Sequence, residues 1–340
     1  MKSSPSLLPS STSSFTFVLL ALLHNIKNHV YASSTSNIHG PISPISNLES
    51  SLTASAAHGT VIAIKAHCPT TQQPCVLLLS HGKFNENIGI NTDTNIDTDI
   101  DTDTSNDFEC FEGYSDSTFH ILSNHPNSSS GPIVMSMTGF TPDLHHILHH
   151  AVQCIHQYRY LYTDDPSYTQ TDTTNNSSYR IVKMIVNAIC QKIRIHAMSD
   201  GGRPFGIQGL IVGPGPSFYT IDPTGNWKYW GGDATAIGKH AHLIRQQLYQ
   251  SLNHYHHQQQ QKQPTPPPPP SVSVSVSISK ALEMALSSLQ QESDSSNDSN
   301  DPNDIRAMII YFGTKRKCVM IQSEIKKAYN TINNPSNDSL

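Results

Sequence analysis

Short apolar runs of strand length alternate along this chain with longer segments that have helical periodicity. The runs are rich in β-branched residues and have turn-like flanks. They predict strands at residues 60–66, 75–80, 118–122, 133–137, 206–212, 217–221, 226–230, 305–312 and 318–322. Apolar residues three and four apart predict helices at about residues 142–162, 179–198, 235–252 and 277–290, and a last helix from residue 323.

This order of elements predicts an α+β fold, because strands and pairs of helices alternate in blocks along the chain. The arrangement that buries all the apolar faces is a four-layer α/β/β/α sandwich of two antiparallel sheets. Each helix pair would cover one sheet. We expect the first four strands to share a sheet, since short turns can join them as hairpins.

Four polar tracts interrupt the pattern, and each has too little apolar surface to offset the entropy of ordering it. We predict disordered insertions at residues 91–107, 164–178, 253–271 and 291–304. The folded domain would then run over residues 58–332. A variable segment, residues 33–57, would precede it, and a disordered tail, residues 333–340, would follow it.

The first 32 residues have the pattern of a secretory signal peptide. Lys2 precedes the apolar segment FTFVLLALL, and Val30 and Ala32 place small residues three and one before a cleavage point. The apolar segment is too short to stay as a membrane anchor. The pattern predicts entry into the secretory pathway, or an organelle reached through it, and a mature chain without a membrane anchor.

The composition bears on two questions: whether the protein binds nucleic acid, and whether its cysteines form disulfides. Charged residues make up 14% of the 340 residues and the net charge is −5, with no basic stripe along the chain. We therefore expect no nucleic-acid partner. The six cysteines include no CxxC pair. Cys154 and Cys190 fall on apolar helix faces, which favours buried single thiols.

The tetrad between the second helix and the next strand has a stiff backbone and one charge: it reads Arg203-Pro204-Phe205-Gly206. Proline cannot continue a helix, so Pro204 helps to end the one before it. Gly206 permits close backbone approach where the strand starts. The guanidinium of Arg203 suits carbonyls at a helix end or a carboxylate on a neighbouring element.

A turn and a glycine-containing joint follow the tetrad. The turn is Asp222-Pro223-Thr224-Gly225, in which Gly225 can take a positive φ. The joint reads ATAIGK and ends at Gly238 and Lys239.

These three motifs, in this order, resemble the middle of a proteasome α-type subunit. The segments HGT at residues 58–60 and SMTGFTPD at 136–143 are similar to other parts of that family. The resemblance implies the N-terminal-nucleophile hydrolase fold and a non-catalytic subunit in the outer ring of a 20S core, acting in ubiquitin-dependent protein catabolism without a cofactor. Partners would be other proteasome α and β subunits in a heptameric ring, and the family's location is the cytoplasm and nucleus.

Two further expectations depend on that resemblance. Lys83 lies near the position of a family lysine in the pocket that receives the C-terminal tails of regulators. The stretch at residues 42–60 keeps only a trace of the family's start, ISP, and lacks its tyrosines. A working axial gate is therefore in doubt.

Threonine catalysis is the first alternative, because catalytic members of the fold use an N-terminal threonine. Thr60 would need a free α-amino group, made by cleavage of the Gly59–Thr60 bond. The second strand, in PCVLLLSHGK, lacks the aspartate of catalytic subunits. We therefore expect no catalytic residue. A second alternative is a secretory-pathway protein that kept the fold and lost the ring.

Two residue patterns superficially resemble metal sites. His145/His149 and His146/His150 have the i, i+4 spacing of helical zinc ligands, but no acidic third ligand accompanies them. Aspartates alternate at residues 97–103 as in a calcium loop, but the required glycine and the final glutamate are missing. We expect no metal at either place.

Overall fold

The computed structural model describes residues 44–57, 59–69, 71–82, 108–110, 115, 118–123, 131–162, 176–199, 202–262, 276–296, 304–312, 317–321 and 323–333. The predicted signal peptide, the tract at residues 91–107, Lys83 and residues 334–340 lie outside this part of the chain.

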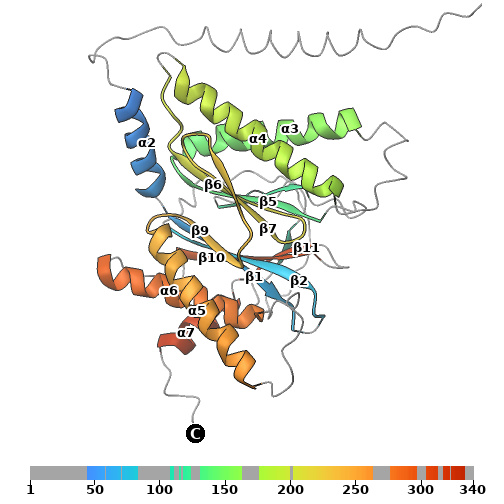
Figure 1. The fold of residues 1–340 in the computed structure, drawn as a ribbon, viewed down its shortest axis with the longest axis vertical. Coiled ribbons are helices and arrows are strands. Elements are labelled where there is room, and N and C mark those ends of the chain that lie inside the picture. Colours follow the sequence, from blue (N-terminus) through green and yellow to red (C-terminus); the bar gives the residue numbers. More distant parts are fainter. Residues whose placement is uncertain are drawn as a thin grey trace, which may run out of the picture.

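Two antiparallel sheets form the centre of the molecule (Figure 1). The six-stranded sheet has the spatial order β3 (Phe108–Cys110), β11 (Lys317–Met320), β10 (Ile305–Tyr311), β2 (Pro74–His81), β1 (Thr60–His67) and β9 (Ala234–Gly238). The five-stranded sheet has the order β4 (Phe119–Ser123), β5 (Ile133–Gly139), β6 (Ile207–Gly213), β7 (Ser217–Ile221) and β8 (Trp227–Trp230).

Helices cover the outer face of each sheet (Figure 1). The five-stranded sheet lies under α3 (Thr141–Tyr162) and α4 (Asn176–Met198), and the six-stranded sheet under α5 (Ala241–Lys262), α6 (Ile278–Ser296) and α7 (Ser323–Asn333). Three buried apolar clusters fill the spaces: one beneath each helical layer and one between the sheets. The predicted four-layer α/β/β/α sandwich is confirmed. Across the described residues, no helix is both long and apolar enough to pass through a bilayer.

The assignment of the first four strands to one sheet was wrong. β1 and β2 pair with each other in the six-stranded sheet, whereas β4 and β5 belong to the five-stranded sheet. β2 takes its second neighbour from the far end of the chain, with Leu78 opposite Met308 in β10. β5 pairs instead with β6, with Ser136 opposite Leu210. A local apolar pattern predicts that a segment is a strand, but it does not predict which distant strand will pair with it.

The helix predicted from residue 235 begins later, because residues 234–238 are the strand β9. Ala236 lies opposite Ile62 of β1, and all five residues of β9 are buried. Such a strand has no polar face, so its pattern cannot be distinguished from a buried helical turn. Gly238 has a φ of 91° and His240 a φ of 53°, and this pair of residues turns the chain into α5.

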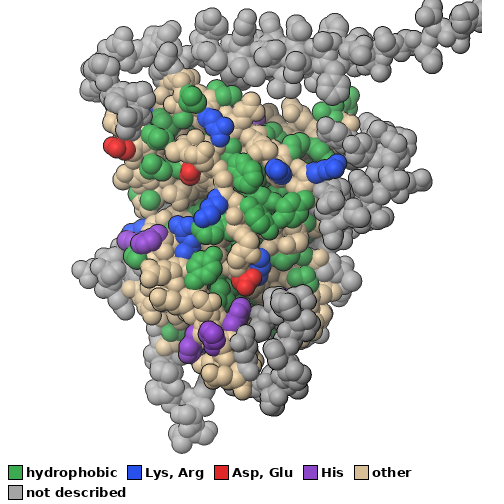
Figure 2. Space-filling model, in the orientation of Figure 1, with side chains coloured by type: hydrophobic (Ala, Val, Ile, Leu, Met, Phe, Trp, Pro, Cys, Tyr) green, Lys and Arg blue, Asp and Glu red, His purple; other side chains and the backbone are tan. Residues whose placement is uncertain are grey.

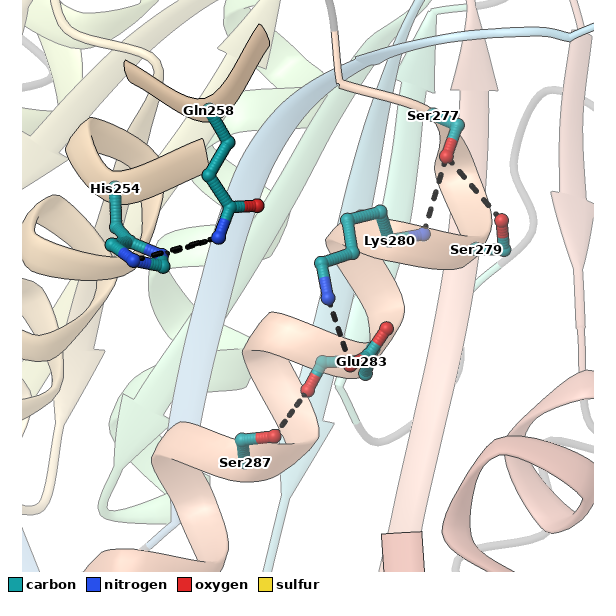
Figure 3. A network of polar contacts seen from close by, with 7 residues as sticks. All are labelled: His254, Gln258, Ser277, Ser279, Lys280, Glu283 and Ser287. Carbon is teal, nitrogen blue, oxygen red and sulfur yellow. Dashed lines mark hydrogen bonds and ion pairs between the residues drawn. The ribbon is translucent and has the colours of Figure 1, made fainter. Parts of the chain in front are cut away.

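Three tracts predicted to be disordered are in part helical. α4 begins at Asn176, inside the expected insertion at residues 164–178. α5 continues through residue 262 and α6 through residue 296, so each extends into an expected insertion (253–271 and 291–304). Glutamine is a good helix former, and Tyr255 packs against the core beneath this layer. Figure 3 shows polar contacts of α5 and α6. Gln258 contacts His254 on α5, and Ser277 Oγ accepts a hydrogen bond from Lys280 N at 3.4 Å where α6 begins.

A helix, α2 (Pro44–Ala57), precedes β1 within the segment for which the sequence predicted no element. It stands beside the two sheets (Figure 1) and contacts β5, β6 and β9. Its sequence, PISNLESSLTASAA, presents small and hydroxylated residues where most buried helix faces carry large apolar ones. This pattern gave no amphipathic signal.

Candidate functional site

Arg203 and Asp143 form the ion pair that fixes the RPFG tetrad. Arg203 Nη1 donates to Asp143 Oδ2 at 2.8 Å, and Nη2 donates to Oδ1 at 2.6 Å. The carboxylate side chain is 5% exposed and that of Arg203 60%. Asp143 lies in the first turn of α3, where the helix dipole favours a negative charge. The predicted carboxylate partner of Arg203 is therefore Asp143.

The same carboxylate also holds the start of β6. Gly206 N donates to Asp143 Oδ2 at 2.9 Å, and Phe140 N donates to Gly206 O at 2.9 Å. The Arg203 guanidinium lies over the Phe140 ring, 5.1 Å from its centroid. One aspartate thus joins the beginning of α3 to the chain that enters β6.

Phe205 and Pro204 connect this joint to three helices. The Phe205 ring, 7% exposed, lies 4.5 Å from the His196 ring of α4 and 5.5 Å from the His146 ring of α3. Pro204 O accepts a hydrogen bond from Ser51 Oγ of α2 at 3.1 Å. The tetrad is therefore a junction rather than a simple helix-to-strand turn.

Helix α2 is held to both sheets by a chain of side-chain hydrogen bonds. Ser55 is fully buried, its Oγ accepts from Gln208 Nε2 at 3.2 Å, and its carbonyl accepts from Thr138 Oγ1 at 3.3 Å. Gln208 Oε1 in turn accepts from Gly238 N at 3.0 Å. Sequence reasoning missed this network, although Ser51 and Ser55, one helical turn apart, were the signal of a polar buried face.

Thr60 occupies the position that a catalytic threonine would take. It is 5% exposed at the start of β1, and its Oγ1 donates to Lys239 O at 2.9 Å. Lys239 N donates to Gly59 O at 2.9 Å, on the other side of the Gly59–Thr60 bond. The backbone groups of Lys239 thus lie on both sides of the Gly59–Thr60 bond.

The surroundings of Thr60 contain no carboxylate on the neighbouring strand. β2 reads PCVLLLSH, and its residue opposite Thr60 is His81. Lys65, the lysine of β1, is engaged elsewhere: its Nζ donates to Gly231 O at 3.3 Å and lies 3.8 Å from Asp233. Gly238, opposite Thr60 on β9, packs closely against Gly59, since a Cβ there would lie 2.3 Å from Gly59 O.

The predicted turn at residues 222–225 is present and is docked on α4. Asp222 Oδ1 accepts from Thr224 N at 2.9 Å and from Asn226 N at 3.1 Å. Gly225 has a φ of 78°, and its carbonyl accepts from Arg194 Nη2 at 3.0 Å. Pro223 completes the turn that leads into β8.

The histidine pairs of α3 have separate surroundings. His149 Nε2 is 2.8 Å from Gln153 Nε2, His150 Nε2 is 3.8 Å from Cys154 Sγ, and His146 packs on Phe205. Burial, with Lys192 nearby, lowers the pKa of His150. In the described part of the chain, no group of three His, Cys, Asp or Glu residues could hold a metal ion. The aspartates at residues 97–103 lie outside it.

All six cysteines are described, and none of them forms a disulfide bond with another. Cys190 is buried in the α4 core as the sequence predicted, whereas Cys154 is only partly buried. Burial raises the pKa of Cys75 and of Cys190 to about 12.

Comparison with known proteins finds a family match to the middle part of the chain. Residues 130–262 match the family described as Proteasome subunit. The chain is 35% identical over 80 residues to a probable proteasome subunit alpha type-2 of Schizosaccharomyces pombe, covering 23% of this chain and 32% of that protein. It is 31% identical over 121 residues to proteasome subunit alpha type-8 of Mus musculus and to the alpha type-7-like subunit of Macaca fascicularis, covering 34% of this chain and 42% of each.

The matches thus span between about a third and two fifths of the length of these curated relatives. Residues 130–262 include α3, the Arg203 joint, the Asp222 turn and β9. Over these residues the chain is similar to proteasome α-type subunits, and the four-layer fold is the setting in which the matched elements lie.

Proposed function

We propose that this chain is a non-catalytic α-type subunit of a proteasome core particle, where it acts as a structural component of the outer ring. The observation that carries the proposal is the state of Thr60. Its hydroxyl donates to a backbone carbonyl, and the adjacent strand β2 offers no carboxylate. A threonine nucleophile needs a free amine to act as its base.

The α2 helix supports the same assignment. It is fastened to β5, β6 and β9 through Ser55 and Gln208, and to the RPFG joint through Ser51. Cleavage before Thr60 would cut the chain between this docked helix and β1.

Exposed apolar side chains on the helical layers are available for neighbouring subunits. On α3, Tyr160 is 77% exposed and Leu161 55%; on α4, Met198 is 78% exposed; on α5, Leu243 is 40% exposed. Large exposed apolar groups commonly mark interaction surfaces. In a ring, contacts through α3 and α5 would cover part of them, and the assembled ring would restrict entry to a chamber whose catalytic threonines belong to other subunits.

The test is to purify the full chain, tagged at its C-terminus, from its native cells and to identify the co-purified chains by mass spectrometry. Recovery of proteasome α and β subunits is the expected result. An untagged strain controls for non-specific capture. Recovery of secretory chaperones without proteasome subunits would overturn the ring assignment and favour a secretory-pathway protein that kept only the fold.

The intact mass of the same purified chain tests the catalytic alternative. A mature chain that begins at Thr60 would contradict the proposal, because it would carry the free amine that a threonine hydrolase requires. A mature chain that retains α2 is expected. The mass also reports whether residues 1–32 have been removed.

A further inference from the structure

At β8, the edge of the five-stranded sheet presents backbone groups that no described strand pairs with. Among the described strands, β8 pairs only with β7, with Tyr219 opposite Tyr229. The other edge of β8 makes no backbone hydrogen bond to any of the described residues. An open strand edge is a template on which another extended chain can pair.

Aromatic side chains lie on one face of this edge. Tyr229 is 45% exposed and Tyr179 of α4 39%, and their ring centroids are 6.3 Å apart. The Tyr219 ring lies within 5.3 Å of Tyr229 and supports it from below. Exposed tyrosines held by neighbouring rings offer a large contact area at a low entropic cost.

Cations lie on the other face of the edge. Side chains alternate along a strand, so Lys228 and Trp230 project to the face opposite Tyr229. The Lys228 Nζ lies 3.9 Å from the Trp230 ring centroid, and the guanidinium of Arg245, from α5, lies 5.0 Å from it. We call Tyr179, Lys183, Lys228, Tyr229, Trp230 and Arg245 the β8 surface.

Lys183 adds a third cation beside the tyrosines. It is exposed on α4, one turn from Tyr179 and one turn from Asn187, which accepts a hydrogen bond from Trp227 Nε1 at 3.0 Å. The nearby carboxylate of Asp233 is already 3.8 Å from the Lys65 ammonium. In a chain of net charge −5, the β8 surface is therefore locally positive.

Figure 2 shows this side of the molecule. Hydrophobic side chains gather at its centre, in the region that Figure 1 draws between α4 and α5, and Lys and Arg side chains lie around them. The two kinds of side chain thus occur together on this side of the molecule.

We propose that the β8 surface binds an acidic peptide segment in an extended conformation, which adds to β8 as a further strand. Lysine on an edge strand discourages pairing with neutral or basic strands, so it selects an acidic partner. Alternate acidic side chains of the peptide lie over Lys228 and Arg245. The intervening apolar side chains lie over Tyr179 and Tyr229.

The test uses the full-length protein and a fluorescein-labelled peptide of sequence DFEVDFEV, followed by fluorescence anisotropy. The wild-type protein is expected to bind it, and Lys228→Glu is expected to weaken binding at least tenfold. Lys326→Glu, at an exposed position on α7 in the opposite helical layer, carries the same charge change and should leave the affinity unchanged. The basic peptide KFKVKFKV should not bind.

Two variants of the probe separate strand addition from simple charge attraction. Methylation of alternate backbone nitrogens of DFEVDFEV removes the donors that a strand needs, so binding should be lost. Equal binding of the methylated peptide would overturn the proposal. Equally tight binding of a 12-nucleotide oligouridylate would also overturn it, because the surface would then be a general polyanion site.

The proposal stands apart from ring assembly, and the two can fail separately. A protein that co-purifies with proteasome subunits but does not bind DFEVDFEV disproves only the peptide site. A protein that binds the peptide but recovers no proteasome subunits disproves only the proposed function. Circular dichroism of each variant shows whether a loss of binding reflects a loss of fold.

Discussion

The guanidinium of Arg203 binds both carboxylate oxygens of Asp143, at 2.8 and 2.6 Å, across 60 residues of sequence. The same carboxylate accepts from Gly206 N, so one buried aspartate sets where α3 begins and where β6 enters the sheet. This pair is the centre of the joint that also receives α2 through Pro204.

Replacement of Asp143 should destabilise the fold. Asp143→Ala removes the bidentate partner of Arg203 and leaves Gly206 N without an acceptor, which should cost about 2–3 kcal/mol of unfolding free energy. Arg203→Lys keeps the charge but loses the fork geometry, and should cost about 1 kcal/mol because the arginine is largely exposed. Urea unfolding followed by circular dichroism measures both. Equal stability of Asp143→Ala and wild type would contradict the role of the joint.

Gly238 should tolerate no side chain. Its φ is 91°, and a Cβ there would lie 2.3 Å from Gly59 O, so Gly238→Ala combines backbone strain with a clash and should cost more than about 2 kcal/mol. Gly215 is the matched control. Its φ is 71°, but a Cβ there would meet nothing within 4 Å, so Gly215→Ala should cost only about 1 kcal/mol. Thermal unfolding compares them, and similar melting temperatures would refute the clash.

Loss of the Gln208 amide should loosen α2. Gln208→Leu removes the bonds to Ser55 Oγ and Gly238 N. It leaves Gly238 N without an acceptor, while Ser55 Oγ keeps its bond to Leu52 O, and should cost about 1–3 kcal/mol. Hydrogen–deuterium exchange should then accelerate in residues 44–57 before it does in β5. Gln153→Leu, on the exposed side of α3, should leave that exchange unchanged. Unaltered protection of α2 in Gln208→Leu would mean that its packing alone holds it.

Thr60 should be dispensable for proteolysis. Thr60→Ala removes the hydrogen bond to Lys239 O and should cost about 1 kcal/mol of stability. Peptidase activity of particles that contain the variant should equal that of the wild type, because the hydroxyl is committed to a backbone carbonyl. An abolished activity, in particles of normal composition, would restore Thr60 as a nucleophile.

The buried thiols should resist modification and should lower stability at high pH. Burial raises the pKa of Cys75 and Cys190 to about 12, so at pH 8 only about one thiol in ten thousand at either site is ionised. These thiols ionise at lower pH when unfolded than when folded, so the stability they contribute is present below pH 9 and lost as pH rises towards 12. Ellman's reagent should label the partly buried Cys68 and Cys154 first. Rapid labelling of Cys75 in folded protein would contradict this.

The sequence alone determined the features that depend on local chemistry. The strands at residues 60–66 and 217–221 and the helix ending at Tyr162 follow from side-chain periodicity, which each segment carries in itself. The turn at Asp222 is likewise local, because the aspartate bonds its own backbone two and four residues on. The layer order followed from the order of these elements.

Only the tertiary structure decided the features that depend on contacts between segments far apart in the sequence. From the sequence, the guanidinium of Arg203 could bind either carbonyls at a helix end or a carboxylate. The packing of α3 beside β6 places Asp143 as its partner. Residues 234–238 form the strand β9 because they pair with the edge of β1. Helix α2 docks on the sheets because Gln208 donates a hydrogen bond to Ser55. A buried hydrogen bond or a pair of strands stabilises the fold only when both partners meet in space. Neither therefore produces a periodic pattern of apolar residues in the sequence.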